Sequence, residues 1–177
     1  DRSLAEAFRV RVLGLIAALD RRLNSDGLLE KLPGWVFVEW SHANELVQDV
    51  NYPSNMMYAE TLDAAARLYG LPNLTERAAK MRETIRRQSL MEDGWYCDNA
   101  IRQKDGSLKL SGERTETCQY YAFFTGVATK DRDAVLWDVL VSDFGPRRIQ
   151  KGAWKEIWPA NMIFGTCLRM ALPSRDG

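Results

Sequence analysis

Histidine and cysteine are scarce in this chain, which has one histidine and three cysteines among its 177 residues. The cysteines Cys97, Cys118 and Cys167 are widely spaced and form no Cys-x-x-Cys pair. A structural zinc site needs about four closely spaced ligands, so we expect no metal site and no cofactor. Cys118 and Cys167 lie in apolar segments and are expected to be buried as small hydrophobic residues.

An excess of charge of one sign is also missing, because 24 basic residues balance 24 acidic residues. No Lys/Arg block stands out beyond pairs such as Arg86-Arg87 and Arg147-Arg148, so nucleic-acid binding has no electrostatic basis. No apolar run approaches the roughly 20 residues of a membrane-spanning helix, and no signal-peptide pattern opens the chain. We expect a soluble protein that binds neither nucleic acid nor membrane.

The chain opens on Asp1 rather than on methionine, inside an expected helix, which suggests a piece of a longer polypeptide. Its localisation is therefore left open. With 46% hydrophobic and 27% charged residues, residues 1–177 have the composition of one globular unit.

Apolar periodicity predicts two kinds of helix. Between Leu4 and Leu23, apolar residues recur every three or four positions, which predicts an amphipathic helix ending near Asn24, before the stop signal Asp26-Gly27. The next helix, about Ser54–Tyr69, is apolar on most sides and is expected to be buried.

The same alternation continues along the chain. Asn73 and Glu76 form a capping-box pattern that predicts the start of a third, heavily charged helix. An apolar helix is predicted from about Thr115 to Val127, a half-polar helix after Asp131, and a last apolar helix over Pro159–Leu172.

The connections between these helices are long and aromatic. Trp35–Val38 is predicted to form a short strand. Trp95–Arg102 and Ser107–Leu110 are predicted to form a β-hairpin that turns at Asp105-Gly106. The loop between the first two helices approaches thirty residues, a length that is usually functional when the loop is ordered.

Helices that are apolar on nearly every side must be covered by neighbours, whereas half-polar helices keep one face in water. The alternation of the two kinds therefore indicates three helical hairpins in concentric rings. We predict an all-α fold, an α/α toroid of which this chain forms about half, with a small β-hairpin in a loop. The polar starts of the inner helices would meet at one end, where the function is expected.

Several segments carry a resemblance to a known family. They are Asp26–Trp40, Gln48–Asn55, Glu116–Phe124, Asp143–Arg147 and Glu156–Asn161. In this order they resemble the six-hairpin catalytic domain of bacterial α-L-rhamnosidases, which are glycoside hydrolases of carbohydrate metabolism.

The resemblance implies an inverting hydrolase. In such enzymes one carboxylic acid protonates the leaving oxygen while a second carboxylate, about 6.5–9.5 Å away, activates water. The family's general acid lies upstream of the resembling region and its general base downstream, and neither segment is recognisable here. The catalytic residues of this chain are therefore left unassigned, and the isolated chain is expected to be inactive while supplying one wall of the substrate pocket.

Nine residues are candidates for that wall, because aromatic rings stack on sugar rings and carboxylates or amides bind sugar hydroxyls. They are Glu39, Trp40, Asn51, Tyr52, Asn55, Glu116, Gln119, Glu156 and Trp158. The interpretation expects Glu39, Glu116 and Glu156 to surround a common hollow. For most candidates a structural role is also open: a carboxylate is favoured at any helix start, and Asn is a common N-cap.

Two other functions remain open. The chain can be a six-hairpin hydrolase of another sugar specificity, or a helical-hairpin binding module without chemistry. The inner helices begin at uneven intervals, near Ser54, Thr115 and Pro159, which favours an enzyme over a regular repeat. An open half-toroid would expose the flanks of its outermost hairpins, so we expect self-association or docking of the rest of the toroid, besides a carbohydrate partner. His42, the only imidazole, is expected to play a supporting or surface role, since no Gly-x-Ser-x-Gly elbow is present.

Overall fold

The computed structural model describes residues 2–145 and 148–175. In chain order the elements are α1 (Arg2–Asp20), the 3₁₀ helix η1 (His42–Glu45), β1 (Val50–Asn51), α2 (Tyr52–Tyr69), α3 (Pro72–Ser89), β2 (Asn99–Arg102), β3 (Leu108–Leu110), α4 (Glu116–Phe124), α5 (Ala134–Ser142), α6 (Arg148–Lys151) and α7 (Met162–Arg175). Pro146 and Arg147, which belong to one of the family-like segments, lie outside the described residues.

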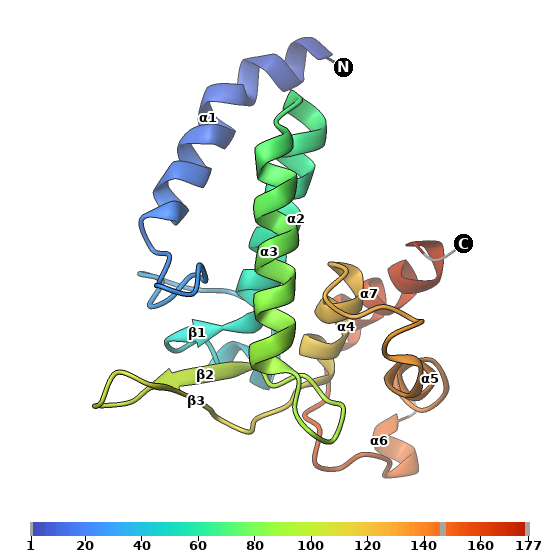
Figure 1. Cartoon of the computed structure of the whole chain (residues 1–177). Helices are drawn as coiled ribbons and strands as arrows, with labels where there is room; N and C mark the ends of the chain where they lie inside the picture. Colours follow the sequence, from blue (N-terminus) through green and yellow to red (C-terminus); the bar gives the residue numbers. More distant parts are fainter. Residues whose placement is uncertain (1, 146–147, 176–177) are drawn as a thin grey trace.

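Helices α2, α4 and α7 form the inner row. Helix α4 contacts both α2 and α7, while α1 and α3 pack against α2. In Figure 1, α2 and α3 form the long central pair, with α1 on one side and α4 and α7 on the other. Eight of the nine residues of α4 are buried, which matches a helix covered by neighbours on all sides. The predicted helical fold, a toroid fragment with a small β-hairpin, is confirmed, but α7 is not covered on all sides, because Ile163, Phe164 and Met170 are exposed.

Both covered helices begin at a side-chain cap. Asn51 accepts a hydrogen bond from the Ser54 amide at the start of α2, and Thr115 accepts one from the Cys118 amide at the start of α4. Helix α2 ends at Gly70, whose φ of 66° suits a left-handed C-cap. These local signals fix where each inner helix begins, and so where its polar end lies.

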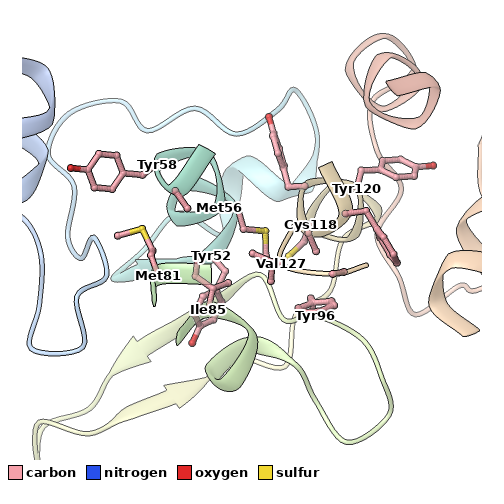
Figure 2. Close-up of a cluster of buried hydrophobic side chains, with 14 of the residues drawn as sticks. Tyr52, Met56, Tyr58, Met81, Ile85, Tyr96, Cys118, Tyr120 and Val127 are labelled. Carbon is pink, nitrogen blue, oxygen red and sulfur yellow. The ribbon is translucent and has the colours of Figure 1, made fainter. Parts of the chain in front are cut away.

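The core lies between α2, α3 and α4. Figure 2 shows Met56 from α2, Cys118 from α4 and Ile85 from α3 contributing to it, with Tyr96 close by. The side chains of Met56, Ile85 and Tyr96 are fully buried. Because interiors are close-packed, this core sets the spacing of the inner helices.

The small sheet has the strand order β1-β2-β3 and is antiparallel throughout. Strands β2 and β3 form the predicted hairpin, with Ala100 opposite Leu110 and Arg102 opposite Leu108. The turn is held by Asp105, whose carboxylate accepts a 2.9 Å hydrogen bond from the Ser107 amide. Strand β1 pairs with β2 and runs directly into α2, so the sheet anchors the start of an inner helix.

The turn between an outer helix and the following segment is built twice in the same way. Leu23–Leu29 and Leu90–Tyr96 each close with an antiparallel bridge between their end residues. Each turn contains an Asp-Gly pair, and Gly27 and Gly94 have φ values of 78° and 86°. A left-handed backbone favours glycine, which explains why the pair recurs.

A side-chain amide then ties each turn to the inner helix. Asn55 of α2 accepts from the Leu29 amide at 2.7 Å and donates to the Leu29 carbonyl at 3.0 Å. Gln119 of α4 does the same with Tyr96, with both distances at 2.9 Å. Each amide satisfies both backbone groups of one buried residue, as a neighbouring strand would.

Three expected elements differ in the structure. Trp35–Val38 is not a strand, because its backbone pairs with no other segment among the described residues. The capping box at Asn73 and Glu76 is absent: α3 already begins at Pro72 and its N-cap, Leu71, makes no side-chain cap. Proline suits the first position of a helix, because an N–H group there would have no intrahelical partner and its absence costs nothing.

The last inner helix begins at Met162 rather than at Pro159, and the two amides after Pro159 bind the carboxylates of Glu116 and Glu39. Cys118 is buried as expected, but Cys167 is exposed, because α7 has fewer neighbours than α4. No described helix has both the length and the apolarity to span a bilayer.

Candidate functional site

Three segments meet at the polar end of the inner helices. The segment before α7 runs alongside the start of α4: the Glu116 amide donates to the Trp158 carbonyl at 2.8 Å, and the Trp158 amide donates to the Arg114 carbonyl at 3.0 Å. The loop around Glu39 joins them, because Asn161 donates its side-chain amide to the Trp40 carbonyl at 3.2 Å. Residues distant in sequence therefore share one polar surface.

Two of the predicted carboxylates bind consecutive backbone amides. Glu39 accepts a 2.9 Å hydrogen bond from the Asn161 amide, and Glu116 accepts a 3.3 Å hydrogen bond from the Ala160 amide. The other Glu39 oxygen accepts from the Thr117 hydroxyl at 2.7 Å. Both acids are buried, with 0% and 5% of their surface exposed. Together they fix the path of the chain as it enters α7.

Glu116 also forms a buried ion pair with Arg148, at 2.9 Å. The remaining donors of Arg148 bind the carbonyls of Ala153 and Trp154, at 3.3 and 2.5 Å, and that of Ile157. Buried charges are tolerated only when they are paired and hydrogen-bonded, and Arg148 meets both conditions. This arginine therefore ties the segment before α7 to the carboxylate on α4.

The second oxygen of Glu116 accepts a 2.5 Å hydrogen bond from the Tyr120 hydroxyl. Burial, reinforced by the Glu116 carboxylate, raises the pKa of Tyr120, so the phenol stays neutral and remains a donor. Glu116, Tyr120, Arg148 and Asn161 are among the residues that line a cavity of about 130 Å³. The polar groups facing it include a carboxylate, a guanidinium and an amide.

Trp158 forms the exposed edge of this surface. Its indole is 46% exposed, yet its Nε1 donates to Glu113 at 3.0 Å. His42 stacks on it with ring centroids 4.0 Å apart and an interplanar angle of 33°. The two His42 nitrogens face Glu45 and Glu113, at 3.2 and 3.9 Å. The indole is thus held in place while much of its surface stays open.

Trp40 lies on the same end and is 64% exposed. It packs edge-on against Phe37 and Phe164, with centroids 4.8 and 6.3 Å apart. Its partner Phe164 belongs to α7, so the aromatic contacts join the Glu39 loop to the last inner helix. We call the exposed surface formed by Trp40, His42, Trp158 and Asn161 the rim.

Four other candidates are buried at the helix starts. Asn51 caps α2 and donates to the Leu46 carbonyl at 2.8 Å, and Asn55 and Gln119 tie the two turns described above. Burial, the main cause, raises the pKa of Tyr52, whose hydroxyl lies 3.4 Å from Gln88. The polar groups of these four side chains form hydrogen bonds within the protein, as expected for the structural role that the sequence left open.

Glu156 does not share a hollow with Glu116. It is exposed and lines a separate hollow with Trp95 and Trp154. The expectation that three carboxylates surround one hollow is corrected, because the chain turns at Trp154, whose φ is 53°, before it reaches the rim.

Arg148, Tyr120 and Thr117 are the residues that sequence reasoning missed. In the sequence Arg148 stands out only as half of the Arg147-Arg148 pair, because a sequence does not show which carboxylate a buried arginine contacts. Tyr120 carried a usable signal, since it lies four residues after Glu116 and therefore on the same helix face. No group of three or more metal-ligand side chains is found among the described residues.

Behind this surface, Asp98 fixes the start of α4. Its carboxylate accepts from the Thr115 amide at 2.6 Å and from the Thr115 hydroxyl at 2.8 Å. Burial raises the pKa of Asp98 to about 7, against the lowering effect of these two hydrogen bonds. The hydroxyl of Thr115 in turn caps α4, next to Glu116.

Comparison with solved structures finds a similar fold in the crystal structure of a GH78 family rhamnosidase of Bacillus sp. GL1. The TM-score is 0.79, the sequences are 19% identical, and the match covers 100% of this chain. The chain spans 18% of the length of that rhamnosidase chain. No family model and no curated protein matches the sequence. The likeness shows the fold, a piece of a helical toroid.

Proposed function

We propose that this chain is part of the catalytic domain of a glycoside hydrolase and supplies one wall of its sugar pocket. The fold likeness to part of a rhamnosidase and the polar surface at the starts of the inner helices support this proposal. The proposed substrate is an α-L-rhamnoside or a related glycoside, hydrolysed at a terminal bond with inversion of configuration.

The observation that carries the proposal is the fixed but open indole of Trp158. A sugar presents a face of C–H groups that packs well on an aromatic ring, and a ring held in advance loses little entropy on binding. Trp158 is held by Glu113, by His42 and by two backbone hydrogen bonds, and it remains 46% exposed.

The other rim residues supply complementary contacts in this proposal. Trp40 offers a second exposed indole, and Asn161 offers the side-chain N–H that does not bind the Trp40 carbonyl. Glu116 lines the adjoining cavity, where its carboxylate can accept a further hydrogen bond from a sugar hydroxyl. Glu39 holds the Asn161 amide and so positions the rim from below.

The proposal assigns the general acid and base to other parts of the catalytic domain. The buried positions of Glu39 and Glu116 support this division, because both carboxylates already accept hydrogen bonds from the protein. We therefore expect this chain alone to bind sugar without hydrolysing glycosides.

Calorimetric titration of the 177-residue chain with L-rhamnose tests the proposal. We expect weak, saturable binding that Trp158→Ala reduces by removing the rim site. Trp35→Ala is the matched control, since Trp35 is 77% exposed and its described ring contact is to Phe37 rather than to the rim. Absence of heat with the parent chain, or equal loss in both variants, would refute the sugar wall and leave a binding module without carbohydrate chemistry. If the chain alone hydrolysed an aryl rhamnoside, the general acid and base would have to lie within these 177 residues, contrary to the proposal.

A further inference from the structure

A second hollow lies on the outer side of the helices. It has a volume of about 850 Å³ and is lined by the end of α3, the 92–95 turn, α5 and the segment around Trp154. This volume falls within the range of small-molecule sites. Neither Glu39 nor Glu116 belongs to it, so it is distinct from the cavity beside the rim.

The floor of this hollow is aromatic. Trp95 and Trp154 pack with ring centroids 5.2 Å apart and an interplanar angle of 59°. Trp95 is buried and also stacks on Phe144, whereas Trp154 is partly exposed. Leu136 and Val139 of α5 complete the apolar lining.

Trp154 is held in a backbone conformation that a bulky residue rarely adopts, with φ at 53°. Its carbonyl accepts from Arg148 at 2.5 Å, and its Nε1 donates to Asp143 at 3.0 Å. Such conformations persist where surrounding contacts impose them, and they cluster at binding sites. Here the contacts present the indole to the hollow.

The wall above the floor offers both a donor and an acceptor. Arg114 lines the hollow with 22% of its side chain exposed and pairs with Asp93 through one terminal nitrogen, so its other terminal nitrogen can donate to a ligand. Glu156 is exposed and makes no ion pair or hydrogen bond with another described residue. An apolar floor beneath a mixed donor and acceptor wall suits a ligand with a C–H face and hydroxyl groups at its edge.

We propose that this outer hollow is a second carbohydrate site, which binds a neutral saccharide ring against Trp95 and Trp154 through hydroxyl contacts to Arg114 and Glu156. The site is non-catalytic and does not depend on the rim. A lining in which guanidinium and carboxylate groups both occur favours an uncharged ligand over a strongly charged one.

Fluorine NMR of the chain labelled with 5-fluorotryptophan tests this site separately from the rim. Each of the six tryptophans gives its own resonance, assigned through single Trp→Phe variants. The probes are L-rhamnose, D-glucose and maltose. We expect at least one of them to shift the Trp154 resonance saturably, in the parent chain and equally in Trp158→Ala.

Glu156→Gln should weaken the response at Trp154 about tenfold, because a hydrogen bond to a charged group is lost, and should leave the Trp158 response unchanged. Glu45→Gln, which alters a carboxylate that contacts the rim residue His42, is the matched control and should leave Trp154 unaffected. No shift at Trp154 with any of the three probes, or an equal effect of Glu45→Gln, would overturn the proposal. A shift confined to Trp158 would overturn it while supporting the proposed function.

Discussion

Glu39 and Glu116, which lie 77 positions apart, accept hydrogen bonds from the adjacent backbone amides of Asn161 and Ala160. These amides precede α7 and would otherwise be unpaired donors at a helix start. A carboxylate at this end of a helix is also favoured by the helix dipole. The two acids therefore join the first and second hairpins to the last inner helix, and they give the rim its shape.

The Glu116–Arg148 pair should be a major determinant of stability. Replacing Glu116 by Gln leaves Arg148 without a counter-ion in a buried position, which costs roughly 3 kcal/mol of the free energy of unfolding. The three carbonyls that accept from Arg148 keep the cost from being larger. Urea denaturation monitored by circular dichroism measures it.

Glu83→Gln is the matched control for this charge pair. Glu83 pairs with Arg132 at the surface, where an ion pair contributes at most about 1 kcal/mol. If both substitutions change the midpoint equally, burial does not distinguish the two pairs and the account of Arg148 is wrong.

Asp98 should make stability depend on pH in an unusual direction. The folded pKa of about 7 exceeds the ordinary value of 3.8, so between these values the folded chain binds more protons at Asp98 than the unfolded chain does. Asp98 therefore contributes stability at low pH that is lost as the pH rises towards 7, by at most about 1.4 kcal/mol per pH unit.

The Asp98→Asn variant isolates this contribution, because an amide still accepts from the Thr115 amide but cannot ionise. Urea titrations across the pH range should show the parent losing stability relative to the variant as pH rises from about 4 to about 7. Parallel stability curves would show that the buried carboxyl is not protonated in the folded chain.

The helices and the hairpin followed from local rules. The apolar run in α2, the turn at Asp105-Gly106 and the apolarity of α4 are each set by residues close in sequence. The start of α7 was misplaced for a non-local reason. Pro159 suits a first helical turn, yet the chain beside it pairs with the start of α4 through Trp158, and the Asn161 amide binds Glu39, 122 residues away.

The sequence predicted where the candidate site lies but not which groups its side chains contact. Glu39, Glu116 and Trp158 do meet, because each precedes or begins an inner helix on the same end of the row. Asn55 and Gln119 stand at equivalent positions, but their partners are backbone groups of Leu29 and Tyr96. No pattern of side chains reveals which backbone groups need a partner.

These two amides supply the third prediction. Asn55→Leu and Gln119→Leu each leave the amide and carbonyl of a buried residue unpaired, and each substitution should cost about 2–4 kcal/mol. The repeated geometry predicts similar losses at both positions, measured by urea denaturation.

Gln103→Leu is the control for these amides. Its side chain lies near the hairpin turn and donates to the Ile101 carbonyl, in a partly exposed setting where water can replace the bond. A small effect at Asn55 or Gln119, similar to that at Gln103, would mean that the amides do not tie the turns to the inner helices.

His42 should set the affinity of the rim for sugar through Trp158. In His42→Ala the indole loses the ring that stacks on it at 4.0 Å, and it gains freedom that sugar binding must remove. An aromatic pair contributes about 0.5–1.5 kcal/mol, so the affinity for L-rhamnose should fall about threefold or more, as measured by calorimetry. Time-resolved fluorescence anisotropy should show faster local motion of the indole.

His42→Phe separates stacking from charge at this position. Phenylalanine keeps an aromatic ring against Trp158 but cannot contact Glu45 or Glu113. Near-parent affinity in His42→Phe, together with a loss in His42→Ala, assigns the effect to stacking. Equal loss of affinity in both variants assigns the effect instead to the contacts of the imidazole with Glu45 and Glu113. Unchanged affinity in both would mean that Glu113 and the two backbone hydrogen bonds hold Trp158 without His42.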